Sequence, residues 1–268
     1  SIGEGLQWAV FDGGDGNDRF ALATSDRAEL IEIEGVEIAD VPDPLVRVTD
    51  LATSLGTLQA SVLATESISV DSAGGDDAVM AKYTLFLPEG TPLRAGVDLE
   101  VLPGEGNDSV RVEVLGGGDV AIDVDTQGGN DSIWMDLGFP VRDGTSNTIL
   151  VAEVRGGAGD DVIEVSAVMG VEPEPFLPDV TLAVLAGEGD DTVDMRVALQ
   201  DASGGDSGAA VDIAVDLGAG QDAARMECTN NLKQLGLGMH VVDPNAGLDQ
   251  DFAASGSVSV HANLMTAR

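Results

Sequence analysis

The stretch that decides the fold is GGAGDDVIEVSAV, residues 156 to 168. Its glycine-aspartate turn recurs along the chain in the variants GGDGND, GEGND, GEGDD, AGGDD, QGGND and GAGQD. Aligned on their last residue, the copies end at Asp18, Asp77, Asp108, Asp131, Asp161, Asp191 and Asp222. Successive aspartates therefore lie 59, 31, 23, 30, 30 and 31 apart in residue number. A repeat of this length is typical of proteins that stack one structural unit on the next.

Strand-like patterns flank each turn. Apolar residues stand two, four and six positions after the aspartate in nearly every copy, as at Ile163, Val165 and Ala167. They also stand eleven, nine and seven positions before it, as at Leu150, Ala152 and Val154. An apolar period of two indicates a strand with one buried face. Each unit is therefore predicted to be a strand, a tight turn and a second strand, as in the segment 150–167.

The connections between units vary in length and hold the structure-breaking residues. From Asp77 onward their lengths are 13, 5, 12, 12 and 13, and one of them contains Pro173, Pro175 and Pro178. A chain that repeats strand, turn, strand and loop stacks each strand beside its counterpart in the next unit. We therefore expect an all-β fold, a parallel two-sheet β-solenoid (β-roll or β-helix-like) with one uniform and one irregular edge. Its rungs would contain about 23 to 31 residues, a length typical of stacked repeats.

The repeat also predicts the domain organisation. Residues 1–228 form the solenoid, with a degenerate rung at about 25–65 that fills the long interval after Asp18. Residues 229–268 are expected to hold an irregular insertion and a final strand at 258–262 within the same domain, and the state of 229–257 stays open. Because the pattern reaches both ends, we expect a segment of a larger array. The single Cys228 falls in the apolar register and is expected to be buried.

Composition excludes several classes of partner. The chain has 12 lysine and arginine residues against 48 aspartate and glutamate residues, a formal net charge of -36. This charge argues against nucleic acid and anionic membrane as partners. No apolar run is long enough to span a bilayer, so no membrane-spanning segment is expected. The hydrophobic content of 43% is placed periodically, which argues against disorder despite the charge.

The turn residues indicate metal chemistry. Glycine permits backbone conformations that crowd carbonyl oxygens together, and aspartate adds a carboxylate, so the donors are the oxygens that calcium requires. Carboxylates stacked about one strand spacing apart, roughly 4.8 Å, would repel each other, which favours a bound cation. In the alternative interpretation, these are metal-free turns whose Asn and Asp side chains bond the backbone. The polar residue before each aspartate could be a ligand or a turn former.

The turns resemble a known family. Residues 13–21 and 156–164 match the pattern G-G-x-G-x-D-x-apolar-x of RTX-type, or haemolysin-type, calcium-binding proteins, and two further units lack only the first glycine. In that family calcium lies between successive turns, held by the aspartate and by turn carbonyls. The resemblance implies calcium as cofactor along one edge only, because the other edge is a variable loop. The implied ligands are Asp18, Asp77, Asp108, Asp131, Asp161, Asp191, Asp222, Gly104, Gly106, Gly157, Gly159, Gly187, Gly189, Asn107, Asp160 and Asp190.

A second resemblance covers two short segments. The strings DGTSNTILVAE at 143–153 and RMECTNNLKQLGLGMH at 225–240 resemble signature segments of planctomycete prepilin-like secreted proteins. In that family the order of the two segments is reversed and an apolar helix precedes them, so pilus assembly is not implied. The resemblance implies a source, an aquatic bacterium of that group.

Enzyme-like strings lack the partners that catalysis needs. Residues 205–208 and 144–146 are similar to serine segments of proteases, but His240 and His261 are the chain's two histidines and both lie near the C-terminus. A carbohydrate-processing, lyase-like solenoid remains the alternative, as does a metal-free acidic solenoid. We expect a non-catalytic, secreted or cell-surface bacterial segment that folds on calcium and acts as a spacer or adhesive. Extracellular polysaccharide or surface proteins would be its partners.

Overall fold

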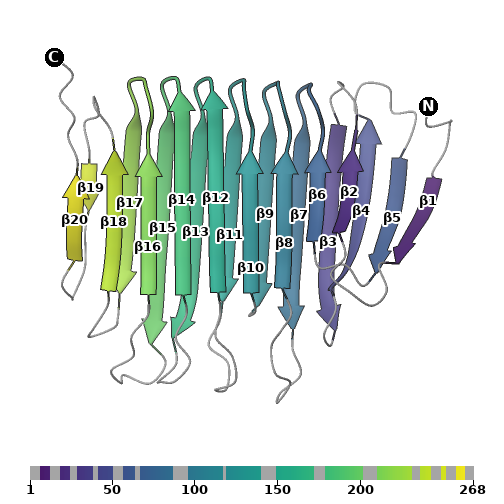
Figure 1. Cartoon of the computed structure of the whole chain (residues 1–268), viewed down its shortest axis with the longest axis horizontal. Helices are drawn as coiled ribbons and strands as arrows, with labels where there is room; N and C mark the ends of the chain where they lie inside the picture. Colours follow the sequence, from purple (N-terminus) through teal and green to yellow (C-terminus); the bar gives the residue numbers. More distant parts are fainter. Residues whose placement is uncertain are drawn as a thin grey trace.

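The chain winds between two facing β-sheets (Figure 1). The computed structural model describes residues 7–12, 19–24, 29–38, 42–50, 57–63, 67–86, 96–116, 119–139, 149–171, 179–201, 210–230, 236–242, 249–251 and 258–262. Within these ranges there is no helix, and hence none long and apolar enough to cross a membrane. The prediction of an all-β, parallel two-sheet solenoid is confirmed.

Each sheet collects alternate strands of the chain. The nine-stranded sheet contains, in spatial order, β2 (Arg19–Ala23), β6 (Ser67–Asp71), β8 (Gly96–Leu102), β10 (Asp119–Asp125), β12 (Ile149–Ala158), β14 (Asp179–Glu188), β16 (Ala210–Asp216), β18 (Gly236–Val242) and β20 (Val258–Ala262). The eleven-stranded sheet contains β1 (Gln7–Asp12), β5 (Thr57–Leu63), β4 (Pro42–Asp50), β3 (Glu29–Ile38), β7 (Ala78–Phe86), β9 (Ser109–Gly116), β11 (Ser132–Phe139), β13 (Val162–Val171), β15 (Thr192–Asp201), β17 (Ala223–Asn230) and β19 (Asp249–Asp251).

From β6 to β17 the winding is regular. Every strand pairs in parallel with its counterparts in the neighbouring rungs, and equivalent repeat positions lie side by side, as Ile163 does with Ile133 and Val193. The glycine-aspartate turns that end at Asp77 to Asp222 connect the nine-stranded sheet to the eleven-stranded sheet, so they lie along one edge (top of Figure 1). We call this the turn edge, made of residues 72–77, 103–108, 126–131, 156–161, 186–191 and 217–222.

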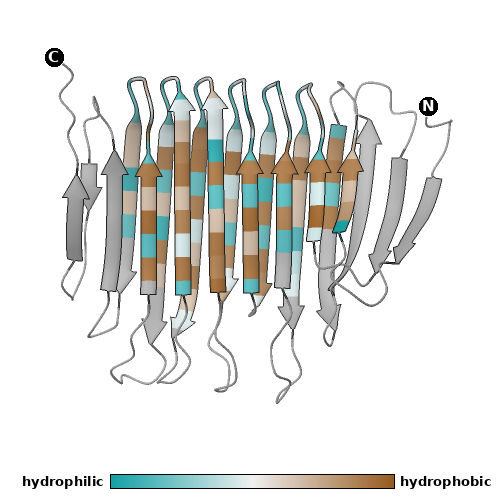
Figure 2. Ribbon diagram, viewed as in Figure 1, coloured by the Kyte–Doolittle hydropathy of each residue, from teal (hydrophilic) through white to brown (hydrophobic). Residues whose placement is uncertain are grey.

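The core lies between the sheets where the apolar period predicted it. Side chains alternate along each strand, with Ile163 and Val165 buried and Glu164 exposed between them. Figure 2 shows the same alternation of hydrophobic and hydrophilic bands on the central strands of both sheets. The buried positions form one continuous cluster, which Phe20 and Leu22 join as partly buried members.

The N-terminal region takes a different form from the expected extra rung. In the nine-stranded sheet β2 pairs directly with β6, so no rung separates them. In the other sheet β3 pairs in parallel with β7, as a rung strand should. However, β4 runs antiparallel to β3 and β5 antiparallel to β4, so both stay in the same sheet. The strand-like segments 30–34 and 45–48 therefore form a meander, because antiparallel neighbours need no crossover to the opposite sheet.

The C-terminal region continues the stack earlier than expected. The segment 236–242, whose state the sequence left open, is β18 and pairs in parallel with β16. The expected next strand at 258–262 is β20, one place further along. Both prepilin-like segments contribute to regular strands, the first to β12 and the second to β17 and β18. Cys228 pairs with Val197 in the ladder, but its side chain is outside the described part.

Candidate functional site

The candidate site is the turn edge, and its glycines are required by the stacking of one turn on the next. Four and two residues before the aspartate, the backbone takes positive φ, 99° at Gly157 and 135° at Gly159. A Cβ at Gly159 would lie 1.8 Å from the carbonyl oxygen of Gly129 in the preceding turn. No real Cβ approaches an oxygen so closely, so only glycine fits at the position of Gly159. Four residues before the aspartate, Ala73 and Gln127 take positive φ without being glycine.

The final aspartates form a line of side chains that we call the aspartate column. Its members are Asp77, Asp108, Asp131, Asp161, Asp191 and Asp222, all buried. From Asp108 to Asp222, each Oδ1 accepts a hydrogen bond from the backbone N–H of the column residue one rung earlier. The N–H of Asp131 donates to Asp161 at 2.8 Å, and the N–H of Asp161 donates to Asp191 at 2.9 Å. The carboxylates therefore tie successive rungs together.

The residues that precede these aspartates form a second line, which we call the outer ladder. Its members are exposed and bond in the opposite direction: the N–H of Asp190 donates to Oδ1 of Asp160, and that of Gln221 to Oδ1 of Asp190, both at 2.9 Å. The sequence left the role of these residues open. Their side chains bond the next turn, so they hold the stack together. The outer ladder comprises Asp76, Asn107, Asn130, Asp160, Asp190 and Gln221.

The second carboxylate oxygen of every column residue has no hydrogen-bond partner. Oδ2 is buried and unbonded in Asp77, Asp108, Asp131, Asp161, Asp191 and Asp222. Asp161 and Asp191 are each only 1% exposed. A buried carboxylate oxygen without a donor is costly, because the lost hydration is not replaced. The column is thus a row of incompletely satisfied acids, one in each turn.

Burial changes the acid strength of the column. It raises the pKa of Asp77 to about 6 and those of Asp108 and Asp161 to about 7, and it also raises the pKa values of Asp131 and Asp191. The backbone N–H bonds lower these pKa values, and the hydroxyl groups of Ser72 and Thr126 also lower those of Asp77 and Asp131. Neighbouring carboxylates raise all five pKa values further. Burial of the charged form is the largest cause in each case.

Asp18, the first aspartate in the sequence row, lies outside the described residues. The strands on either side of it enter the two sheets in the opposite order from those of the other turns. β1, before it, is in the eleven-stranded sheet, and β2, after it, is in the nine-stranded sheet. Because β2 is parallel to β6, it leads toward the turn edge, as β6 does.

The structure places Glu29 beside Asp77, a residue that the repeat pattern missed. Glu29 is 5% exposed, and its backbone N–H donates to Oδ1 of Asp77 at 2.8 Å, as column residues do. Its carboxylate accepts a hydrogen bond from Oγ1 of Thr24. The sequence from Thr24 to Glu29 has neither glycine nor aspartate at the motif positions. A hydroxyl five residues before an acid, as in Ser72 and Asp77, is the signal that could have found it.

The predicted ligands do not all converge. Asn107, Asp160 and Asp190 belong to the exposed outer ladder, separate from the buried column. Among the predicted glycines, the carbonyl of Gly187 accepts the N–H of Ala219 at 2.8 Å. Within the described residues, no three His, Cys, Asp or Glu side chains gather with the spacing of a metal site. The available ligand atoms nevertheless suit a hard cation such as calcium, because the buried atom without a hydrogen bond in every turn is a carboxylate oxygen.

The chain matches no protein-family model, no curated protein and no solved structure. What the turn edge does must therefore be argued from its own chemistry.

Proposed function

We propose that this chain is a non-catalytic, calcium-stabilised repeat segment of a secreted or cell-surface bacterial protein, acting as a spacer or adhesive stalk. One observation carries the proposal. Each turn from Asp77 to Asp222 buries a carboxylate whose Oδ2 has no hydrogen-bond donor. A row of such groups calls for neutralisation, either by protons or by cations.

Calcium is the cation that best fits these donors. It accepts six to eight oxygen ligands and tolerates irregular geometry, whereas magnesium demands a near-ideal octahedron. The Oδ2 atoms of Asp108, Asp161 and Asp191 would supply the anionic ligands, and turn carbonyls and water would complete the shell. Bound calcium would supply positive charge where the chain has none.

Calcium binding would make folding depend on whether the chain is inside or outside the cell. A cation that binds the stacked turns and not the unfolded chain stabilises the fold in proportion to its concentration. The formal charge of -36 makes the metal-free chain self-repelling, so low cytosolic calcium would leave it loosely folded. High extracellular calcium would then drive stacking after export.

A metal-free acidic solenoid is the second candidate, and the same edge gives it a specific argument. The Oδ1 atoms already bond the neighbouring rungs, and pKa values of about 7 allow Asp108 and Asp161 to be partly protonated in neutral solution. In this second account protons neutralise the buried carboxylates, as calcium does in the first account. The two accounts differ in what a chelator does.

Thermal melts followed by circular dichroism separate the two accounts. At pH 8 calcium should raise the melting temperature over that in chelator, and magnesium should do so less. The double variant Asp161→Asn and Asp191→Asn should weaken this calcium response. The control is Glu105→Gln with Glu188→Gln, which removes two exposed turn carboxylates and should keep the response. Identical melts of the native chain in calcium and in chelator would overturn the calcium proposal.

A further inference from the structure

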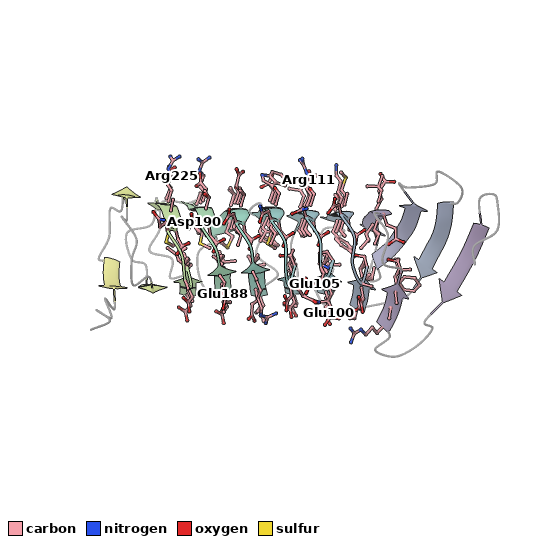
Figure 3. All side chains as sticks on the ribbon, turned by 90° about the horizontal axis from the view of Figure 1, so that it is seen from above. Glu100, Glu105, Arg111, Glu188, Asp190 and Arg225 are labelled. Carbon is pink, nitrogen blue, oxygen red and sulfur yellow. The ribbon has the colours of Figure 1, made fainter. Side chains whose placement is uncertain are left out.

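The two outer faces of the solenoid differ in charge. On the eleven-stranded face the described cations all pair with acids. Lys82, Arg196 and Arg225 pair across strands with Glu113, Glu227 and Asp194, respectively, whereas Arg111 pairs within its own strand with Glu113, and Arg225 also pairs within its own strand with Glu227. Figure 3 shows Arg111 and Arg225 projecting on this side, with Glu100 on the opposite side. The eleven-stranded face is therefore close to charge balance over its described side chains.

The nine-stranded face is strongly acidic. Among its described side chains the cations are Arg19, which pairs with Glu100, and Arg155, which pairs with Asp123 and Glu153. Both arginines are thus already neutralised. Other exposed carboxylates on this face form no ion pair with a described residue: Asp98, Asp119, Asp179 and Asp212.

Apolar side chains interrupt the acids at the centre of this face. Ile149 and Val151 of β12 are 43% and 44% exposed, and Leu185 of β14 is 37% exposed. In the ladder Ile149 lies between Asp119 and Asp179, so a carboxylate flanks it on either side. Leu185 lies between Asp216 and Arg155, and Arg155 is paired with Asp123 and Glu153. The result is an apolar strip that begins at Ile149 and Val151 on β12 and ends at Leu185 on β14, with unpaired acids beside Ile149 and on the β16 side of Leu185.

We propose that this strip and its acidic margins bind a basic amphipathic helix of a partner protein. The strip extends over about six residues of strand, roughly 20 Å, which a helix covers in about four turns. Helices commonly pack on sheet faces through an apolar stripe. Lysine or arginine residues on either side of that stripe would meet the carboxylates, which favours a basic partner and raises its association rate. This inference is independent of calcium binding at the turn edge.

The test measures binding of a fluorescent helical peptide of lysine and leucine by anisotropy, with oligolysine of equal charge as comparison. The double variant Ile149→Ser and Val151→Ser should weaken peptide binding at least about fivefold, because it removes exposed apolar surface without changing charge. The matched control is Met80→Ser with Val162→Ser, which removes similarly exposed residues, 43% and 42%, from the other face and should leave affinity unchanged.

A second pair of variants tests the acidic margins. Asp119→Asn with Asp179→Asn should weaken peptide binding more than Asp136→Asn with Glu164→Gln, which removes the same charge from the eleven-stranded face. Equal losses from both pairs, or equal affinity for oligolysine and the peptide, would show non-specific attraction to an acidic protein and overturn the inference. Circular dichroism confirms that each variant folds. Titrations in calcium and in chelator keep this result separate from the calcium proposal.

Discussion

The stack from β6 to β17 and the N-terminal strands β1 to β5 differ in how the chain passes from one strand to the next. In the regular region each rung crosses from one sheet to the other through a glycine turn, and the aspartate column bonds every rung to the next. In the N-terminal region the chain makes a meander within one sheet before it joins the stack (right of Figure 1). Glu29, at the start of β3, bonds Asp77 of the column, and the sequence before it has no motif glycine.

This difference shows the separate roles of the aspartate and the glycine in the repeat. Glu29 takes the place of a column aspartate because its backbone N–H, and not its side chain, bonds Asp77. A rung at the end of the column needs only to donate this hydrogen bond, whereas an internal rung must also accept one. Glycine is required two residues before the aspartate where a turn is stacked on a preceding turn, as Gly159 is on Gly129. The motif is therefore a requirement of internal rungs.

The largest effect should come from filling the space between two stacked turns. In Gly159→Ala the new Cβ would meet the Gly129 carbonyl oxygen at 1.8 Å, in a backbone conformation with φ of 135° that alanine disfavours. We expect a loss of about 3 kcal/mol or more in unfolding free energy, measured by urea denaturation.

Gly128→Ala is the matched control for this prediction. Gly128 lies in the adjacent turn without positive φ, and its new Cβ would meet only the flexible Glu105 carboxylate at 3.0 Å. Its cost should be below about 1 kcal/mol. If Gly128→Ala destabilises as much as Gly159→Ala, close stacking of glycines does not explain the motif.

The strands and turns of the region from β6 to β17 were predicted from the sequence almost completely. The period of two placed Ile133, Met135 and Leu137 in the core, and the aligned aspartates anticipated one edge of stacked turns. The sequence pattern could not predict that Oδ1 bonds the preceding rung, because such bonds depend on the register between segments far apart in the sequence. Its assignment of Asp18 to the row stays a prediction, because Asp18 lies outside the described residues. Glu29 was missed because the sequence before it has no glycine at the motif positions.

The column should also make the metal-free protein less stable as pH rises. The folded pKa values of Asp77, Asp108 and Asp161, about 6, 7 and 7, lie above the usual value of 3.8. The folded state then binds more protons than the unfolded state, so this stabilisation is complete below about pH 4 and is lost as pH rises through 6 to 7. In chelator, the unfolding free energy from urea titrations should fall between about pH 4 and pH 8.

Asp161→Asn tests whether the column causes this pH dependence. The amide oxygen still accepts the Asp131 N–H but does not titrate, so the slope of unfolding free energy against pH should become shallower. Asp136→Asn, an exposed change on the eleven-stranded face, should leave the slope unchanged. A native protein whose stability rises from pH 4 to pH 8 in chelator would contradict the burial of these acids.

The smallest effect should separate the end of the column from its interior. At about pH 5 in chelator, Asp161→Ala removes the acceptor of the buried Asp131 N–H and should cost about 1 to 3 kcal/mol. Glu29→Ala removes the acceptor of the Thr24 hydroxyl, which is partly exposed and can bond water instead, while the bond from residue 29 N–H to Asp77 remains. Its cost should be about 0.5 kcal/mol, read from the same urea titrations. A loss at Glu29 equal to that at Asp161 would mean that the first carboxylate supports the stack through its side chain, and that the column does not simply end with a donated N–H.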